Sequence, residues 1–268
     1  MQERHIDRKR YFEEQAQTCR KYYIPYIKNH IGHLPHKVLE VGCGEGGNLL
    51  PFAESGCEVV GVDIARSRIE QAQSCFIDSN QKGTFIASDI FQLSSLEKSF
   101  PLILIHDTVE HIEHKAQFLS GIKKYLSSGG AIFVAFPAWQ MPFGGHQQIA
   151  RGKVISHLPF IHLLPRFLYR WVLKACGEKE DTIKELLSIK QTRCSIEMFR
   201  NIAGQAGYRI TDERLYLLNP HYEVKFGLSP RKLSKGIAMI PYIRNFFSTS
   251  CFYMLRQNEI SRTYIVNT

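Results

Sequence analysis

The sequence predicts an α/β protein with a doubly wound, mostly parallel sheet of seven strands and a helical lid insertion. Three observations support this prediction. Continuous apolar segments recur from residue 37 onward, segments of helical periodicity separate them, and glycines follow the first one. Strands that are buried on both faces of a parallel sheet have continuous apolar segments of this kind. Their alternation with helices is typical of a doubly wound sheet.

The first five strands are predicted around residues 38–41, 59–62, 86–89, 102–105 and 131–136. A helical stripe that includes Ile69 and Phe76 lies between the second and third of them. A later helix is predicted to begin at the cap residue Ser195 and to end at Gly207. Two more strands, over residues 208–218 and 250–257, complete the sheet.

The chain is expected to divide into four segments. Residues 1–35 form an N-terminal helical segment, in which residues 3–31 are a charged amphipathic helix over one end of the sheet. Residues 36–137 and 195–257 form the sheet domain. Two insertions interrupt it, a helical lid over residues 138–194 and a second insertion over residues 219–248.

The composition is that of a globular protein with a basic second half. The 268 residues are 44% hydrophobic and 22% charged, which excludes a disordered or fibrous chain. Residues 1–134 hold 15 Lys and Arg against 16 Asp and Glu, whereas residues 135–268 hold 19 against 9. This asymmetry favours either an anionic partner for the second half or a solubilising surface, and both readings stay open.

The cysteines predict a cytoplasmic protein. Seven of them are scattered along the chain without a C-x-x-C spacing, as expected for reduced thiols rather than a zinc ribbon. The first fifteen residues are charged where a secretory signal needs an apolar stretch. Prolines and cations interrupt the apolar stretch 158–176, so it is not expected to span a bilayer as one helix.

A glycine-rich loop follows the first predicted strand. Gly42, Gly44 and Gly47 satisfy G-x-G-x-x-G, a pattern that lets a ligand approach the backbone at a strand-to-helix turn. Glu40 lies directly before this loop, where it would repel a pyrophosphate and attract a cationic group. The sequence therefore favours a ligand with a positive charge at this point.

Two more acids are predicted at the carboxyl ends of strands, where open α/β sheets bind ligands. Asp63 ends the second strand, 19 residues after Gly44, where a carboxylate can accept both hydroxyls of a ribose. Asp89 ends the third strand.

The sequence resembles the class I S-adenosylmethionine-dependent methyltransferases. The resemblance is carried by VLEVGCGEGGNLLPFAESGCEVVGVDIARSRIEQAQ, FIASDIFQL and LILIHDTVEHIEHKAQFLSGIKKYLSSGGAIFVAFP. It is strongest for the small-molecule branch that includes ubiquinone-biosynthesis-type O-methyltransferases. It covers residues 36–137 and, more loosely, 195–257, and it implies S-adenosylmethionine as the cofactor.

The resemblance also implies a cofactor site. The positions implied for the methionine part and the sulfonium are Glu40, Gly42, Cys43, Gly44, His106 and Asp107. Those implied for ribose and adenine are Asp63, Ile64, Asp89 and Ile90. Glu40 would support the ammonium group, and Ile64 would pack on the adenine.

Two histidines are candidate catalytic residues. His146 follows the fifth strand, and its ordinary pKa near 6.5 suits removal of a proton from a hydroxyl acceptor. His111 follows the fourth strand and would face the cofactor or the acceptor. A structural loop residue for His146 and a helix-start residue for His111 are the alternatives. The spacing of His111 and His114 matches no zinc motif, so no metal is expected.

The lid insertion suggests the acceptor class. Arg166, Arg170 and Lys174 recur beside bulky apolar residues, as in a helix that lies on a membrane surface or in a lid packed on the domain. The second insertion repeats this mixture. We therefore expect a small-molecule, glycan or lipid-linked acceptor, with peripheral membrane-surface contact left open. No nucleic-acid-binding motif was identified, so nucleic acid is not the expected partner.

The predicted reaction is direct transfer of a methyl group from the sulfonium to an acceptor oxygen. Alignment and exclusion of water are then the protein's main contributions. Two alternatives stay open, an NAD(P)-dependent oxidoreductase and a non-catalytic protein that binds S-adenosylmethionine. The oxidoreductase reading leaves Glu40 and Asp89 without a role.

Overall fold

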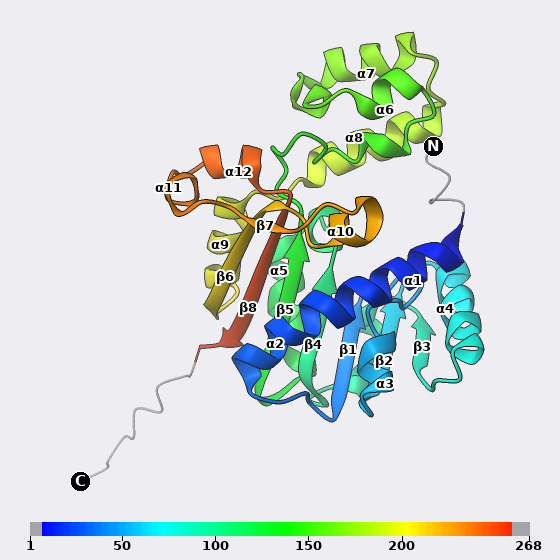
Figure 1. Ribbon diagram of the computed structural model, residues 1–268, viewed down its shortest axis with the longest axis vertical. Helices are drawn as coiled ribbons and strands as arrows, with labels where there is room; N and C mark the ends of the chain where they lie inside the picture. Colours follow the sequence, from blue (N-terminus) through cyan, green and yellow to red (C-terminus); the bar gives the residue numbers. More distant parts are fainter. Residues whose placement is uncertain (1–6, 259–268) are drawn as a thin grey trace.

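The computed structural model describes residues 7–258, and for Lys153 the backbone alone. It contains one sheet with the strand order β3-β2-β1-β4-β5-β8-β6-β7 (Figure 1). The strands are β1 Lys37–Val41, β2 Glu58–Asp63, β3 Thr84–Ala87, β4 Phe100–His106, β5 Leu126–Phe136, β6 Tyr208–Leu218, β7 Arg231–Lys232 and β8 Ser250–Gln257.

The first five strands are parallel, and β8 runs antiparallel to both β5 and β6. The doubly wound, mostly parallel sheet predicted from the sequence is therefore confirmed. The predicted number of seven strands is wrong by one. The two-residue strand β7, from the second insertion, pairs with the edge of β6 and makes the eighth.

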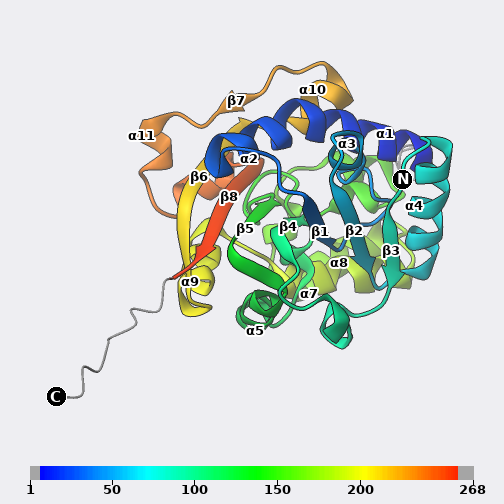
Figure 2. The same ribbon diagram turned by 90° about the horizontal axis from the view of Figure 1, so that it is seen from below.

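The N-terminal helices cover one face of the sheet together with α3 and α4 (Figure 2). They are α1 Arg8–Thr18, a π-helical turn Cys19–Tyr23, and α2 Ile24–Ile31; α3 spans Leu50–Glu54 and α4 spans Arg66–Asp78. Asp7 caps α1 by accepting a hydrogen bond from the backbone of Arg10. The predicted helix over residues 3–31 is thus three consecutive helical segments, and residues 3–6 lie outside the described part.

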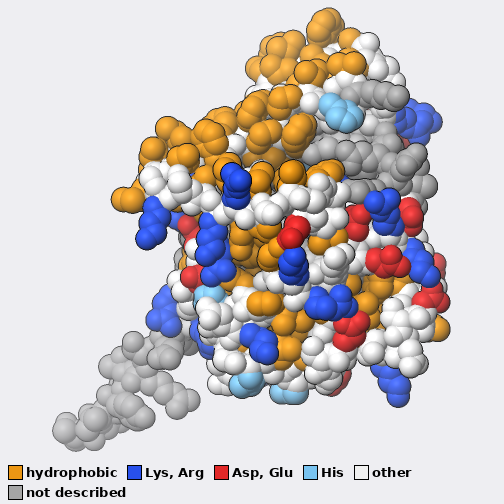
Figure 3. Space-filling model, in the orientation of Figure 1, with side chains coloured by type: hydrophobic (Ala, Val, Ile, Leu, Met, Phe, Trp, Pro, Cys, Tyr) orange, Lys and Arg blue, Asp and Glu red, His pale blue; other side chains and the backbone are white. Residues whose placement is uncertain are grey.

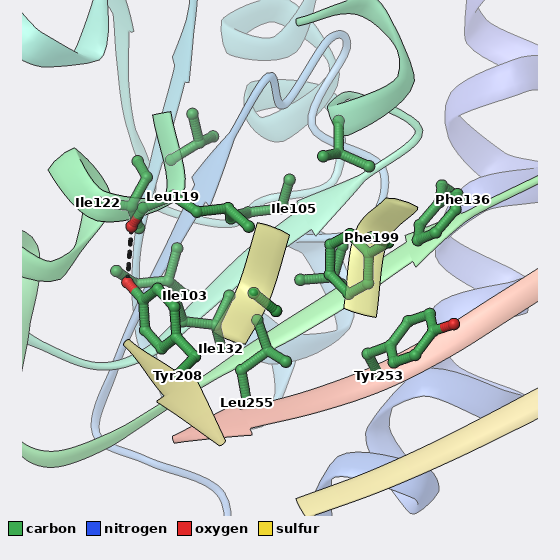
Figure 4. Close-up of a cluster of buried hydrophobic side chains, with 14 of the residues drawn as sticks. Ile103, Ile105, Leu119, Ile122, Ile132, Phe136, Phe199, Tyr208, Tyr253 and Leu255 are labelled. Atoms are coloured by element: carbon green, nitrogen blue, oxygen red, sulfur yellow. Dashed lines mark hydrogen bonds between the residues drawn. The ribbon is translucent and has the colours of Figure 1, made fainter. Parts of the chain in front are cut away.

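The other face is covered by α5 Lys115–Ile122 and α9 Ile196–Gln205. Their apolar side chains pack against β4, β5 and β8 in a cluster that includes Phe199 and Tyr253 (Figure 4). At its edge the hydroxyl of Tyr208 donates to the carbonyl of Leu119 over 2.9 Å. Ser195 caps α9, as predicted, through its hydrogen bond from the backbone of Met198.

The two insertions lie above the carboxyl edge of the parallel strands (Figure 1). The first contains α6 Lys153–His157, α7 Arg166–Ala175 and α8 Glu180–Thr192, which share a small core of their own. The second contains α10 His221–Phe226, α11 Lys235–Ala238 and α12 Ile243–Phe247. A hydrogen bond from the amide of Ala138 to the carbonyl of Ser248 joins the bases of the two insertions.

Short 3-10 turns connect several of these elements. They are η3 Ile90–Gln92, η4 Ser94–Leu96, η5 Val109–His111, η6 Lys123–Tyr125, η7 Gln147–Ile149 and η8 Ile161–Leu163. None of the helices within residues 7–258 combines the length and the apolar character needed to cross a bilayer.

Phe199 is expected to be a major contributor to stability, because its ring is fully buried between Phe136 and Tyr253. Phe199→Ala should lower the free energy of unfolding by about 3–5 kcal/mol, measured by urea denaturation with circular dichroism. Phe167→Ala, at an exposed position on α7, is the matched control and should change it by less than about 0.5 kcal/mol. Equal effects of the two substitutions would contradict this packing.

Candidate functional site

Acidic side chains meet at the carboxyl edge of the three central parallel strands. Glu40 lies one residue before the end of β1, Asp63 is the last residue of β2, and Asp107 directly follows β4. Because β1 pairs in parallel with both β2 and β4, these positions share one edge. Asp89 lies two residues beyond the end of β3 at the same edge.

The glycine loop after β1 makes a sharp turn and packs closely against neighbouring residues. Gly42 has φ +74°, and a Cβ there would lie 2.4 Å from the hydroxyl oxygen of Thr108. Gly44 has φ +52°, and its amide donates to Asp63 Oδ2 over 2.9 Å. Only glycine accommodates both the left-handed backbone and the close approach at position 42.

A cavity lies between this loop, the end of β4 and helix α1. It is lined by Tyr11, Gln15, Glu40, Gly42, Cys43, Gly44, Glu45, Asn48, Arg68, His106 and Asp107. Six of these residues, Glu40, Gly42, Cys43, Gly44, His106 and Asp107, were predicted from the sequence as the methionine and sulfonium part of a cofactor site. The structure therefore brings all six to one cavity.

Glu40 is a buried acid with one unused oxygen. Asn48 Nδ2 donates to Oε1 over 2.8 Å, whereas Oε2 has no hydrogen-bond partner within residues 7–258. Burial raises the pKa of Glu40 to about 8, and the charges of Asp63 and Asp107 act in the same direction. A cation in the cavity would remove this penalty, so the carboxyl group is suited to bind one.

Asp63 lies at the carboxyl edge of the sheet, and its carboxylate also accepts hydrogen bonds from the backbone of the glycine loop and of the residues after β2. Its Oδ2 accepts from the amide of Gly44, and its Oδ1 accepts from the amide of Ala65 over 2.8 Å. A carboxylate offers about four lone-pair positions, so two remain for ligand hydroxyls. Ile64, next to it, is 82% exposed and is available to pack on a ligand ring.

Asp89 and Ile90, which were predicted to bind adenine, follow the end of β3 and do not both present their side chains to a ligand. The Asp89 carboxylate accepts a hydrogen bond from the amide of Phe91 and is exposed. The side chain of Ile90 is buried in the core cluster, so only its backbone can face a ligand. The Cys43 side chain is buried in the same way, and only its backbone suits the role of lining residue.

The end of β4 is fixed by the N-terminal helices. His106 Nε2 lies 2.8 Å from the hydroxyl of Tyr23, and their rings are in contact. Asp107 follows in a left-handed conformation with φ +46°. Burial raises the pKa of both Tyr11 and Tyr222, and the charge of Asp107 acts in the same direction. Asp107 therefore acts electrostatically on residues of both α1 and α10.

The candidate catalytic histidines come together beyond Asp107. His146 lies on the loop after β5 and His111 in η5, and their ring centroids are 5.1 Å apart. Glu110 completes the group, with its Oε1 3.8 Å from His146 Nε2. Possible ligand atoms of all three lie within 4.8 Å of one another.

Glu110 is the buried member of this group, which we call the Glu110 cluster. Neither of its carboxylate oxygens has a hydrogen-bond partner in the described part of the chain, and burial raises its pKa well above the ordinary value. Desolvation lowers the pKa of His111, which favours its neutral form. Such a group can transfer protons or hold a divalent cation, although no metal is expected from the sequence.

Several residues at the site were not found from the sequence. Tyr11 and Gln15 reach the cavity only because α1 crosses the sheet, and no local pattern signals this crossing. Arg8 of the same helix pairs with the buried Glu45 of the glycine loop over 2.7 Å. Glu110 did carry a signal, because it adjoins a candidate histidine in a segment that follows a strand.

Comparison with known proteins identifies the domain that carries this site. Residues 38–130 match a methyltransferase domain. A ubiquinone biosynthesis O-methyltransferase of Bartonella quintana is 32% identical over 120 residues, which are 43% of this chain and 49% of that protein. The chain thus spans about half the length of the curated relatives it matches.

Solved structures show the fold over most of the chain. The plantazolicin methyltransferase BamL, in complex with a triazolic desmethylPZN analogue and SAH, has a TM-score of 0.58 and 11% identity, covering 96% of this chain and 89% of its own. An S-adenosylmethionine-dependent methyltransferase from Clostridium acetobutylicum has a TM-score of 0.56 and 11% identity, covering 92% of each chain. Residues 38–130 are therefore similar to a methyltransferase domain, and the chain as a whole has the fold of these methyltransferases.

Proposed function

We propose that this protein is an S-adenosylmethionine-dependent O-methyltransferase. The observation that carries the proposal is the buried Glu40, which has one oxygen without a hydrogen-bond partner within residues 7–258 and lines the cavity behind a glycine loop that Asp63 holds. This arrangement fits a ligand with an ammonium group and a ribose, which is the chemistry of this cofactor. The name of the Bartonella relative and the SAH in the BamL complex support the same conclusion.

The residues present fit the cofactor, part by part. Glu40 and the loop from Gly42 to Gly44 hold its amino-acid end, and Asp63 accepts its ribose hydroxyls. Ile64 packs on the adenine, with Asp89 and the backbone of Ile90 at its edge. When bound, S-adenosylmethionine supplies a methyl group activated on a sulfonium. His106 and Asp107 then border the reacting end.

The Glu110 cluster is the proposed acceptor side of the site. His146 takes the proton of the acceptor hydroxyl and becomes an imidazolium. Glu110, 3.8 Å from its Nε2, lies where a carboxylate stabilises that cation. His111 borders the same group and helps to orient the acceptor. The helices of the first insertion exclude water from this end of the sheet.

The acceptor belongs to the hydroxylated small molecules, glycans or lipid-linked precursors. A panel of these acceptors with methyl-labelled S-adenosylmethionine tests the proposal, and transfer of label to none of them would favour a non-catalytic binding protein. Titration with S-adenosylmethionine and with NADH separates the methyltransferase from an oxidoreductase. Binding of NADH alone would overturn the proposal.

Cofactor binding is expected to release protons from Glu40. With a pKa of about 8, the free carboxyl group is mostly protonated at neutral pH, and an ammonium group beside it favours the carboxylate. Calorimetry at neutral pH in buffers of different ionisation enthalpy should show release of up to about one proton, and the release should vanish above pH 8. Below pH 8 the affinity should accordingly rise with pH.

Glu40→Gln is the matched control for this measurement. The amide keeps the size of the side chain and cannot ionise, so its titration should show no proton release from this position and weaker binding. The same proton release in both proteins would show that Glu40 does not face the ammonium group.

His146→Ala is expected to slow methyl transfer by roughly 10² to 10⁴ while cofactor affinity is unchanged. The loss should shrink at high pH, because an acceptor that is already ionised needs no base. His114→Ala, at an exposed histidine outside the Glu110 cluster, is the control and should keep the wild-type rate. Near-wild-type turnover of His146→Ala at neutral pH would exclude the base role.

Metal removal distinguishes proton transfer from metal binding, the two functions that the residues of the Glu110 cluster allow. If His146 is the base, EDTA should leave the rate of the wild-type protein unchanged. Loss of activity with EDTA, and its recovery with one divalent cation, would instead make Glu110, His111 and His146 metal ligands.

A further inference from the structure

Large apolar side chains are exposed on the two insertions. Those on α7, on α12 and on the loops beside them form what we call the apolar face: Phe160, Phe167, Trp171, Tyr242, Ile243 and Phe246. Hydrophobic side chains gather over α11, α12 and the inserted helices above them (Figure 3). A monomer seldom exposes so many aromatic side chains together without a binding role.

The apolar face is continuous between the two insertions. The rings of Phe160 and Phe246 are in contact, with centroids 6.3 Å apart. Phe160 precedes η8 in the first insertion, and Phe246 belongs to α12 in the second. Segments separated by more than eighty residues therefore contribute to one surface.

Helix α7 is apolar on two sides. Tyr169 and Leu173 face inward and are fully buried in the core of the first insertion. Phe167 and Trp171, four residues apart, are 76% and 65% exposed. The core of the insertion, within the described residues, includes the inner pair and not the outer pair.

Cations accompany these apolar groups. Arg166, Arg170 and Lys174 lie on α7 itself, and Lys235 begins α11. Glu180 neutralises part of this charge through ion pairs with Arg170 and Lys174. The second half of the chain nevertheless holds 19 Lys and Arg against 9 Asp and Glu. Exposed aromatic rings next to an excess of cations are typical of a surface that inserts shallowly among anionic lipids.

We propose that the apolar face docks on an anionic lipid bilayer, with Phe167, Trp171 and α12 entering the interface. The charge complementarity favours a bilayer over a second copy of this basic chain, because two such surfaces would repel each other. For the acceptor, this inference rests on the proposed function. A docked enzyme receives a hydroxylated acceptor that is linked to a lipid.

The docking surface is tied to the loop that carries His146. The amide of Phe160 donates to the carbonyl of Pro142 over 2.7 Å. The buried side-chain amide of Gln147 donates to the carbonyls of Pro142 and Leu158, over 3.1 and 3.0 Å. The loop that meets the bilayer is therefore hydrogen-bonded to the loop at the acceptor site.

Intrinsic fluorescence tests the docking, because the two tryptophans differ. Trp171 is exposed, whereas Trp139 is buried. Vesicles of phosphatidylcholine with phosphatidylglycerol should shift the emission of the full chain to shorter wavelength, and brominated lipids should quench it. Phosphatidylcholine alone should have a weaker effect, and Trp171→Phe should abolish the shift. The shift is measured without cofactor or acceptor, so it does not depend on methyl transfer.

A pair of variants makes the test specific. The double variant Phe167→Glu with Trp171→Glu should reduce co-sedimentation with the anionic vesicles at least roughly tenfold. Ile77→Glu, at a 77% exposed position on α4, is the matched control and should bind as wild type. Both variants should keep wild-type activity on a water-soluble acceptor.

Two outcomes would overturn the docking proposal. One is equal vesicle binding by the wild type and the double variant, or no binding by either. The other is self-association of the wild type that the double variant loses, since this would assign the apolar face to a second copy of the chain. Failure of methyl transfer with intact vesicle binding would instead count against the proposed function alone.

Discussion

The arrangement of the site depends on the burial of one acid, Glu40, within the central strand. Its carboxyl group is buried, and within residues 7–258 Asn48 is its only hydrogen-bond partner. A buried acid of this kind costs free energy unless it remains protonated or meets a cation. The structure tolerates this cost at the point where five parallel strands direct their carboxyl ends to the same edge. Because of its position in the sheet, Glu40, whose burial costs free energy, is suited to bind a cation.

The Glu110 cluster forms a second group of ionisable side chains at this edge, separate from the surroundings of Glu40. Around Glu40 the cavity is lined by two further acids, Glu45 and Asp107, and by residues of α1, whereas around Glu110 two imidazole rings lie near a single carboxyl group. Asp107 stands between them, and its charge affects the ionisation of groups in both. The division corresponds to the two demands of group transfer, which are to hold the donor firmly and to activate the acceptor.

The sequence predicted the parts that local patterns specify. The continuous apolar strands, the strands over residues 208–218 and 250–257, and the cap at Ser195 all lie where expected. The third strand is an exception, because β3 ends at Ala87 and Asp89, which was predicted to end it, lies two residues further on. Glu40, Gly42 and Gly44 were predictable as an acid and two glycines around the end of the first strand, whereas the family resemblance implied the roles of Cys43, His106 and Asp107. Strand β7 was not, since two polar residues carry no periodicity and pair only because β6 offers an open edge. The contributions of Tyr11 and Gln15 depend on long-range packing, which no local pattern encodes.

Helix α1 links the stability of the N-terminal part of the fold to the occupancy of the cavity at the sheet edge. Tyr11 and Gln15 form one wall of the cavity, Glu40 and Gly44 form the other, and the Arg8–Glu45 ion pair fastens the two. A molecule bound between these walls contacts both and holds the helix against the sheet. Occupancy of the cavity and docking of α1 are then linked equilibria, each raising the other by the same factor. Ligand binding at the sheet edge therefore also stabilises the N-terminal end of the fold.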